Sequence, residues 1–243
     1  MMKCILLILF KEKDSLVKLI QDYGFVLVGE KDFKNKKGEF EKVFVKKIYP
    51  DNPEGIDPVE MSRKYYPCFI DSERVKKFIV PIIPEYHDRL FQDYRHRQVS
   101  FNDYLYDNPQ GNTIKKAYLS NFKTRKIKPG DILLFYRTHD EQKVTSIGIV
   151  DSIHYGLSDV DEIWRLLDRD RSVYTYEEVE KYKKPLNIII FRHHFNFPKP
   201  VSREELIING IIKHAPRSIN EMTQDKYDYI KRAGELNGRF TFN

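Results

Sequence analysis

Eight lysine and arginine side chains fall between residues 111 and 155, and their shared chemistry is that of phosphate binding. They are Lys115, Lys116, Lys123, Arg125, Lys126, Lys128, Arg137 and Lys143. Cations on one surface neutralise the phosphates of a nucleic acid and release its counterions. The acids that could balance them are few, chiefly Asp131, Asp140 and Glu141. The favoured interpretation is a nucleic-acid surface, and the alternative is an ordinary solvated face.

Aromatic residues near these cations could supply stacking surfaces for bases. Tyr118, Phe135, Tyr136 and Tyr174 are the candidates, because a base can stack on any aromatic ring. The alternative is that they belong to the core, which is the commoner place for aromatic residues on strands. Neighbouring side chains on a strand point to opposite faces. We therefore expect Tyr136, with its polar hydroxyl, to line a pocket and Phe135 to lie in the core.

Metal binding and covalent catalysis have no support in the sequence. His193 and His194 are adjacent, and adjacent strand residues point to opposite faces, so they cannot chelate one metal ion together. The chain has two cysteines, Cys4 and Cys68, too few for a disulfide scaffold or a cysteine zinc site. No Gly-x-Ser-x-Gly sequence, P-loop or paired-acid motif occurs. We expect no catalytic residues, no metal site and no cofactor.

Composition indicates a foldable chain with a basic surface. The 243 residues are 41% hydrophobic, 14% aromatic and 32% charged, with a formal net charge of +6. This length corresponds to one large or two modest domains. The only strongly apolar run, residues 4–10, is too short to span a bilayer and lacks the cleavage site of a signal peptide. We expect a cytoplasmic protein without a membrane partner.

The cations and aromatic residues above must be positioned by the elements of residues 111–155. Asn112 and Thr113 offer N-cap oxygens, and the apolar residues that follow at helical spacing predict a short helix. Ser120 and Asn121 would then either cap its end or read a base edge. Residues 128–131, Lys-Pro-Gly-Asp, predict a turn. Strands are predicted over 132–137, buried on both faces, and over 144–153. Gly148 inside the second strand indicates a bulge or a close backbone approach.

This ordered series resembles the PUA-like family, in the branch that includes the EVE and ASCH modules. The resemblance rests on residues 128–136, the Ile147–Val150 strand, residues 170–174 before an acidic helix, and the Ile188–Arg192 strand. It covers residues 77–232. It implies a PUA-like β-barrel that binds RNA or a modified base. The predicted nucleic-acid-binding residues are Lys115, Lys116, Tyr118, Ser120, Asn121, Lys123, Arg125, Lys126, Lys128, Tyr136, Arg137, Arg171, Tyr174 and Arg192.

The first 50 residues resemble the C-terminal end of a GNAT acetyltransferase domain. Strands are predicted over 3–10, 25–29 and 40–48, and a helix over 15–23. The Gln/Arg-x-x-Gly-x-Gly/Ala turn that holds the pyrophosphate of acetyl-CoA in that family does not occur in this chain. Ile20 also stands where the family often has an aromatic acid. We expect the catalytic half of such a fold to be missing here or supplied by another chain.

The remaining segments complete an α+β protein. Four prolines, Pro50, Pro53, Pro58 and Pro67, mark residues 51–76 as a linker that lies against a domain, and residues 77–232 are expected to form the PUA-like domain. Residues 78–83 are predicted as an edge strand and 186–191 as a buried strand. Helices are predicted over 85–91, 158–167, 175–182, 202–209 and 219–230. Residues 233–243 form the tail, of which residues 237–243 are expected to fray.

The favoured function is a non-catalytic nucleic-acid-binding module, with RNA or a modified base as its ligand. One alternative is an acetyltransferase-family protein without its catalytic half. A second is a protein-interaction module of a stress or defence system, with a protein partner on the N-terminal piece.

Overall fold

The computed structural model describes residues 4–9, 14–34, 38, 40–95, 114–167 and 173–243. The helices that it describes are α1 (Asp14–Asp22), α2 (Pro58–Lys64), α3 (Pro84–Leu90), α4 (Gln92–Arg95), α6 (Val160–Leu167), α7 (Tyr176–Lys181), α8 (Arg203–Ile208), α9 (Gln224–Ala233) and the 3-10 helix η2 (Gly238–Phe240). The strands are β1 (Cys4–Leu9), β2 (Val26–Lys34), β3 (Phe40–Lys47), β4 (Phe69–Ile70), β5 (Lys77–Ile82), β6 (Lys115–Ser120), β7 (Ile132–Arg137), β8 (Lys143–Leu157), β9 (Leu186–Ser202), β10 (Asn220–Met222) and β11 (Thr241–Phe242). The chain is therefore a mixture of helices and sheets, as the sequence predicts.

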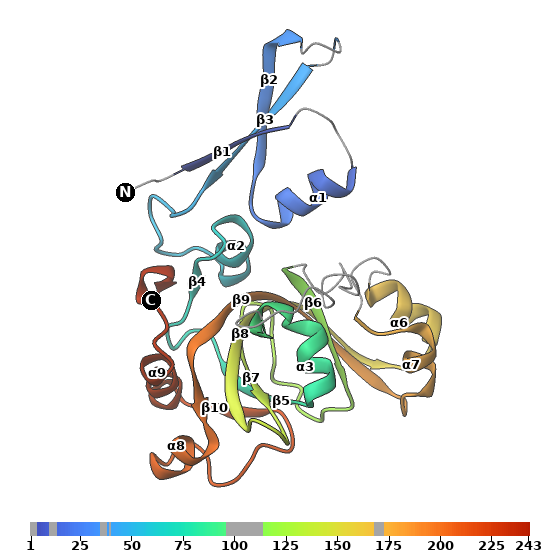
Figure 1. Cartoon of the computed structure of the whole chain (residues 1–243), viewed down its shortest axis with the longest axis vertical. Coiled ribbons are helices and arrows are strands. Elements are labelled where there is room, and N and C mark those ends of the chain that lie inside the picture. The colour runs from blue at the N-terminus through green and yellow to red at the C-terminus, as the bar shows by residue number, and fades with distance from the viewer. Residues whose placement is uncertain (1–3, 10–13, 35–37, 39, 96–113, 168–172) are drawn as a thin grey trace.

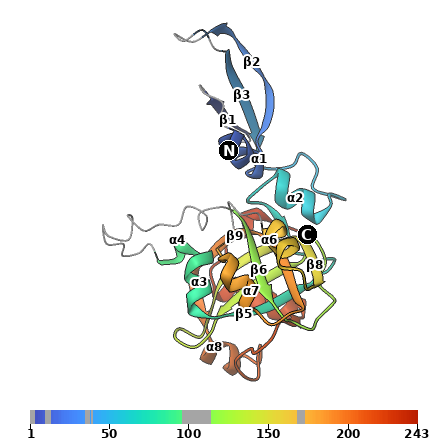
Figure 2. The same cartoon turned by 90° about the vertical axis from the view of Figure 1, so that its right-hand side faces the viewer.

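The N-terminal residues form a small α/β unit that projects from the rest of the chain (Figures 1 and 2). Its antiparallel sheet has the order β1-β3-β2. The three strands and the helix α1 confirm the elements predicted here, although β2 runs further than expected. Val26, Leu27 and Val28 on the edge strand β2 are exposed. The unit thus leaves part of its apolar surface in contact with solvent.

The main body is a strongly curved sheet with the order β10-β5-β7-β8-β9-β6 (Figure 1). The pair β5 and β7 is parallel, and the other pairs are antiparallel. Within the described residues, no hydrogen-bonded ladder joins β6 to β10 or β5. The predicted barrel is therefore a curled, open sheet in this part of the chain.

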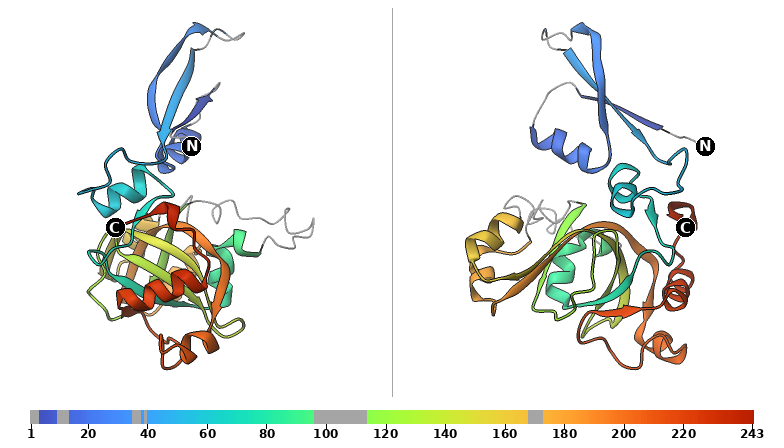
Figure 3. Two further views of the ribbon diagram at one scale, coloured as in Figure 1. Left: turned by 90° about the vertical axis from the view of Figure 1, so that its left-hand side faces the viewer. Right: turned by 180° about the vertical axis from the view of Figure 1, so that it is seen from behind.

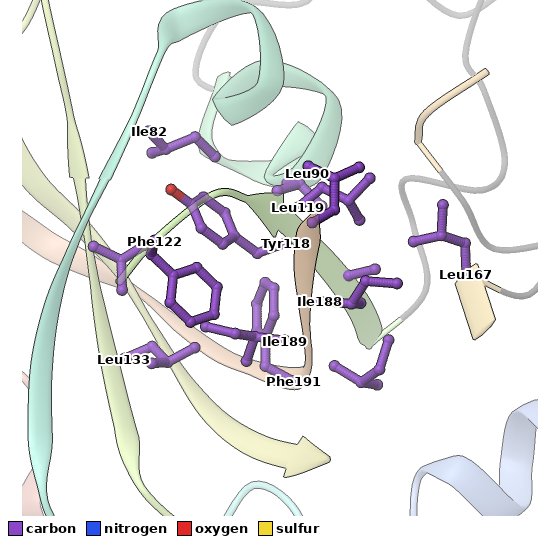
Figure 4. Packing of buried hydrophobic residues seen from close by; sticks show 14 of the residues in the cluster. Ile82, Leu90, Tyr118, Leu119, Phe122, Leu133, Leu167, Ile188, Ile189 and Phe191 are labelled. Atoms are coloured by element: carbon purple, nitrogen blue, oxygen red, sulfur yellow. The ribbon is translucent and has the colours of Figure 1, made fainter. Parts of the chain in front are cut away.

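Period-two alternation along the central strands builds a hydrophobic core on each face of this sheet. Leu133 and Phe135 of β7 lie in the first core, together with residues of α3, α6 and α7. Leu134 and Tyr136 lie in the second core, with residues of α2 and α9. Figure 4 shows part of the first core, and Figure 3 shows α9 along the sheet. The prediction that Phe135 and Tyr136 face opposite sides is confirmed.

Two glycines have the backbone roles that the sequence predicts. Gly130, in the predicted turn, has a φ of 88°, and a Cβ atom there would lie 2.6 Å from Pro58 Cβ. Gly148 lies at a register shift between β8 and β9, and a Cβ atom there would lie 2.5 Å from Phe191 Cδ2. Asp131 fixes the turn, because its carboxylate accepts hydrogen bonds from the amides of Lys76 and Lys128 at 2.9 and 2.7 Å.

The predicted helix at residues 112–118 is wrong where the structure describes it. Residues 115–120 form β6, which pairs antiparallel with β9 from Lys115↔Arg192 to Ser120↔Asn187. Both faces of β6 are buried, because Lys116, Ala117, Tyr118 and Leu119 are all shielded from solvent. Pairing with a long strand and burial on both faces outweigh the local helical spacing. Residues 112 and 113 lie outside the described part.

Other expectations also change. The predicted linker, residues 51–76, contains α2 and β4 and places Met61, Phe69 and Ile70 in the second core. The tail was expected to fray, but β11 pairs with β4, and Phe242 packs on the same core. Strand β5 lies between β10 and β7 and is not an edge strand. Its proline, Pro81, lies beyond the short ladder with β10, so its lack of an N–H costs no hydrogen bond to that strand. The predicted last helix begins only at Gln224, after β10.

Candidate functional site

A large cleft opens where β5 and β7 run past the end of β10. Its volume is about 1050 Å³, and its lining comes from segments far apart in the sequence. They are Pro81 and Ile83, residues 118 and 120–124, residues 136, 138, 139 and 142, Arg203, and residues 214–219. A cleft of this size can hold a nucleotide or another molecule of similar bulk.

Aromatic rings form the inner wall of the cleft, and its two tyrosines differ in whether their hydroxyl groups have a hydrogen-bond partner. Tyr118 is 8% exposed, and its hydroxyl donates a hydrogen bond to the carbonyl oxygen of Pro81 at 2.9 Å. Tyr136 is 0% exposed, and its Oη has no hydrogen-bond partner among the described residues. Phe122 adds a third, nearly buried ring. The wall therefore combines apolar ring surface with one buried hydroxyl that is free to bond.

Arg203 is held in the cleft by Gln142. The backbone N–H of Arg203 donates to the Gln142 carbonyl at 2.8 Å, and its Nη1 donates to Gln142 Oε1 at 2.8 Å. Its Nε is buried and has no hydrogen-bond partner among the described residues. No Asp or Glu of the described chain forms an ion pair with Arg203. The guanidinium is thus fixed in orientation while part of its hydrogen-bonding capacity stays unused.

The hairpin between β7 and β8 forms one rim of the cleft and has an unusual backbone. His139 and Gln142 have φ values of 63° and 51°, in the left-handed region that few non-glycine residues adopt. Thr138 supports the turn, because its Oγ1 donates to the Ile82 carbonyl at 3.1 Å and lies 2.8 Å from His139 Nδ1. Gln142 Nε2 donates to the His139 carbonyl at 3.2 Å. This bonding holds Gln142 where it can orient Arg203.

The charged residues that line the cleft are all basic. Lys123, Arg203 and Arg217 are joined there by His139 and His214. Of the described residues that line the cleft, none is an aspartate or a glutamate. A concave surface lined by one sign of charge focuses its field and attracts ligands of the opposite sign. The arrangement suits an anionic ligand with an apolar or aromatic part.

Five predicted site residues lie together in this cleft. They are Tyr118, Ser120, Asn121, Lys123 and Tyr136. Asn121 is exposed, and its side-chain amide donates to the Lys183 carbonyl at 2.5 Å. Because β6 is a strand, neither Ser120 nor Asn121 caps a helix. The sequence thus located one side of the cleft.

The other predicted lysines, and Arg125, do not line the cleft. Lys115 forms an ion pair with Asp151 at 3.4 Å, and Lys116 is buried, which lowers its pKa to about 8. Lys126 pairs with Glu221 at 2.9 Å. Arg125 lies over the Tyr155 ring at 4.5 Å and donates to Asn187. Lys128 is exposed beside the Lys-Pro-Gly-Asp turn. The single basic surface that the sequence suggested is therefore dispersed.

Arg137, Arg192 and Tyr174 were predicted to contact nucleic acid, but they are structural residues. Arg137 is buried and ion-paired with Asp88 and Asp140. Arg192 is buried and binds Asp151 and the N-terminal unit. Tyr174 is buried in the first core, where its hydroxyl accepts the Leu119 amide at 3.2 Å. In each case burial and partners within the chain use up the groups that a ligand would need. Arg171 lies outside the described residues.

Sequence reasoning missed Phe122, His139, Gln142, Arg203 and Arg217. No local motif marks them, because the fold brings them together from loops and strand ends. The one usable sign was the position of Arg203 directly after a helix N-cap, Ser202. Arg203 lies beside the hairpin because the ladder between β8 and β9 pairs Lys143 with Ser202, the residue before Arg203.

The two neighbouring histidines behave as predicted. His193 contacts the Phe91 ring, in the first core, while His194 contacts Phe69, in the second. They therefore point to opposite faces. Among the described residues, no group of His, Cys, Asp or Glu has the arrangement of a metal site. No described helix is long and apolar enough to cross a membrane.

Comparisons with known proteins give structural likenesses only. No protein-family model and no curated protein matches the chain. The structure is similar to that of ASCH from Zymomonas mobilis, with 13% identity and a TM-score of 0.46 over 63% of this chain and 92% of that one. It is also similar to human THYN1, solved in complex with DNA containing 5-methylcytosine, with 12% identity and a TM-score of 0.40 over 67% of this chain and 99% of that one. Protein Atu2648 from Agrobacterium tumefaciens has 14% identity and a TM-score of 0.40 over 70% and 99%.

Proposed function

We propose that this chain is a nucleic-acid-binding protein of the PUA-like kind that holds a nucleotide in the cleft beside β7. The observation that carries the proposal is the charge of the lining, whose described residues include lysine, arginine and histidine but no aspartate or glutamate. Nucleic acids are the common cellular ligands that combine dense negative charge with flat, apolar rings.

The shape and polarity of the cleft support the same ligand class. Tyr118 and Phe122 supply ring surface, and Ser120 and Asn121 supply hydroxyl and amide groups suited to the edge of a base. Lys123 and Arg217 are exposed at the rim, where they can meet phosphates. The proposed arrangement is a base inside the cleft with its sugar-phosphate backbone along the basic rim.

A matched pair of lysines tests the proposal. Lys123 lines the cleft, whereas Lys126, three residues further along, lies outside it in an ion pair with Glu221. We expect Lys123→Ala to weaken the binding of short RNA and DNA oligonucleotides. It should also reduce the slope of log affinity against log salt by about one, as expected for the loss of one phosphate contact. Lys126→Ala should leave both quantities near those of the unchanged protein.

Fluorescence anisotropy at several salt concentrations measures these effects, and circular dichroism melting shows that both variants fold. Arms with RNA, DNA and DNA that contains 5-methylcytosine separate the three ligand types. Equal losses in the two variants would argue that the cleft is not the binding site. A preference for RNA or for a modified base, the remaining binding roles of Lys115 and Lys128, and the GNAT-like nature of residues 1–50 stay predictions.

A further inference from the structure

We propose that the deep end of the cleft, formed by Arg203 and Tyr136, is an oxyanion subsite that takes the terminal phosphate of a nucleic-acid strand. This inference rests on the proposed function and adds a ligand group to it. Its basis is the unused hydrogen-bonding capacity of two buried atoms, Tyr136 Oη and Arg203 Nε, in residues that line the same cleft.

Arg203 has the features of an arginine prepared for an anion. Gln142 bonds its backbone N–H and its Nη1, which fixes the plane of the guanidinium. Its buried Nε has no acceptor within the described chain. Glu204, its neighbour in sequence, is exposed and forms no ion pair with it among the described residues. A guanidinium offers donors in a fixed fork that matches the oxygens of a phosphate or carboxylate.

Tyr136 adds a second donor. Its ring is fully buried in the second core, the residue lines the cleft, and its buried hydroxyl has no partner among the described residues. Burial raises the pKa of this hydroxyl; the charge of Arg203 opposes that rise, and the charge of Glu204 adds to it. The group therefore keeps its proton and can donate it to an acceptor. Buried polar groups without partners are rare in folded proteins, and a bound ligand is one explanation for them.

A ligand group at this site must accept hydrogen bonds from Tyr136 and Arg203. It must also balance the charge of Arg203, with which no described carboxylate forms an ion pair. A keto oxygen of a base could accept the hydrogen bonds, but it would leave the charge of Arg203 without a counter-ion. A phosphate satisfies both requirements. The depth of the site favours a strand end, because an internal phosphodiester would require the strand to continue on both sides of a fully buried hydroxyl. A terminal phosphate has one ester bond and three free oxygens.

The test compares three versions of one ten-nucleotide strand, with a 5′-phosphate, with a 3′-phosphate, or with hydroxyl groups at both ends. The variants are Tyr136→Phe and Arg203→Gln. Tyr155→Phe is the control, because its hydroxyl already bonds the Ile127 carbonyl and Tyr155 does not line the cleft. Binding is measured by anisotropy in the full chain, and folding by circular dichroism. Inorganic phosphate serves as a competitor without a nucleoside.

In the unchanged protein and in Tyr155→Phe, one phosphorylated strand should bind about tenfold more tightly than the hydroxyl-ended strand, the effect of one charge-assisted hydrogen bond. Tyr136→Phe and Arg203→Gln should reduce that preference to less than about twofold, because they weaken the phosphorylated strand more than the hydroxyl-ended strand. Inorganic phosphate should weaken only the phosphorylated strand's advantage.

The failures are distinguishable. If the unchanged protein binds all three strands equally, the oxyanion subsite is wrong and the proposed function stands. If both variants weaken all three strands equally, the pair binds another part of the nucleotide and the subsite is likewise wrong. If no strand binds at all, the proposed function and the subsite fail together.

Discussion

Arg137 and Arg203 lie on either side of the end of β7, and their surroundings are opposite in character. Arg137 belongs to an acidic cluster that comprises Arg137, His87, Asp88, Asp140 and Glu141. Its guanidinium bonds Asp88, pairs with Asp140 at 2.6 Å and with Glu141 at 3.5 Å, and donates to His87 Nδ1 at 3.0 Å. Among the described residues, the Arg203 side chain bonds only the side-chain amide of Gln142, and no carboxylate pairs with it.

The difference shows how a structural cation and a binding cation are told apart. The side chain of Arg137 is only 4% exposed, and its charge is already compensated, so a phosphate would have to displace its partners. Arg203 has no ion pair with a described carboxylate that an incoming anion would have to displace. The sequence alone shows two arginines of equal charge. Their partners in the structure show which one is structural and which one is able to bind an anion.

The largest expected effect comes from breaking the acidic cluster. Arg137→Ala leaves Asp88 and Asp140 without their counter-charge and should lower the free energy of unfolding by about 3 kcal/mol. Urea denaturation followed by circular dichroism measures this change. Arg203→Gln, the matched substitution in the cleft, should change the same quantity by less than about 1 kcal/mol, because no ion pair is lost. A larger loss in Arg203→Gln than in Arg137→Ala would reverse the two assignments.

The acidic cluster should also make stability depend on pH through His87. This ring is buried, and its burial together with the charge of Arg137 lowers its pKa to about 4. Arg137 donates to Nδ1, so Nε2 carries the proton that bonds Thr145 Oγ1 at 2.7 Å. Since the unfolded ring has a pKa near 6.5, the unfolded state binds more protons between about pH 6.5 and 4. Stability should therefore fall as pH falls through that window, by roughly 2–3 kcal/mol for this ring.

Denaturation between pH 7 and 4 measures the loss, and His87→Gln supplies the control. The variant should be less stable at pH 7, but the gap from the unchanged protein should narrow as pH falls toward 4. Asp140 does not confuse the result, because the hydrogen bond from Arg137 lowers its pKa to about 2. Its contribution is lost only below about pH 4. An imidazole signal of His87 that titrates near 6.5 in the folded protein would contradict the prediction.

The sequence predicted the parts of the fold that local patterns specify. The run from Ile132 to Arg137 between a turn and a hairpin could only be a buried strand, and period-two alternation correctly divided Phe135 from Tyr136. The helix predicted over 175–182 is present as α7, and Thr175 and Glu178 form a capping box at its start. Each of these depends on residues within a few positions of one another.

Longer-range features could not be predicted in this way. Residues 115–120 carry apolar side chains at helical spacing, and only the ladder with β9 makes them a strand. Burial on both faces removes the alternation that would have revealed it. The cleft needs Arg203 beside Gln142, which requires β9 to run for 17 residues back to the hairpin. Whether a cation such as Arg137 or Lys126 is paired depends on distant acids that no local motif shows.

The smallest expected effect separates the two tyrosines of the cleft. Tyr118→Phe removes a hydroxyl that donates to Pro81, and the carbonyl loses its partner, so the free energy of unfolding should fall by about 1 kcal/mol. Tyr136→Phe removes a buried hydroxyl that has no partner within the described chain, so the same quantity should stay constant or rise by up to about 1 kcal/mol.

The two substitutions delete the same atom from nearly buried rings, so their difference isolates the partner of each hydroxyl. Urea denaturation at pH 7 without nucleic acid measures both, since a bound ligand would stabilise the folded state of the unchanged protein. A loss in Tyr136→Phe equal to that in Tyr118→Phe would mean that the Tyr136 hydroxyl already has a partner in the free protein. The comparison between a satisfied acidic cluster and an unsatisfied cleft would then rest on Arg203 alone.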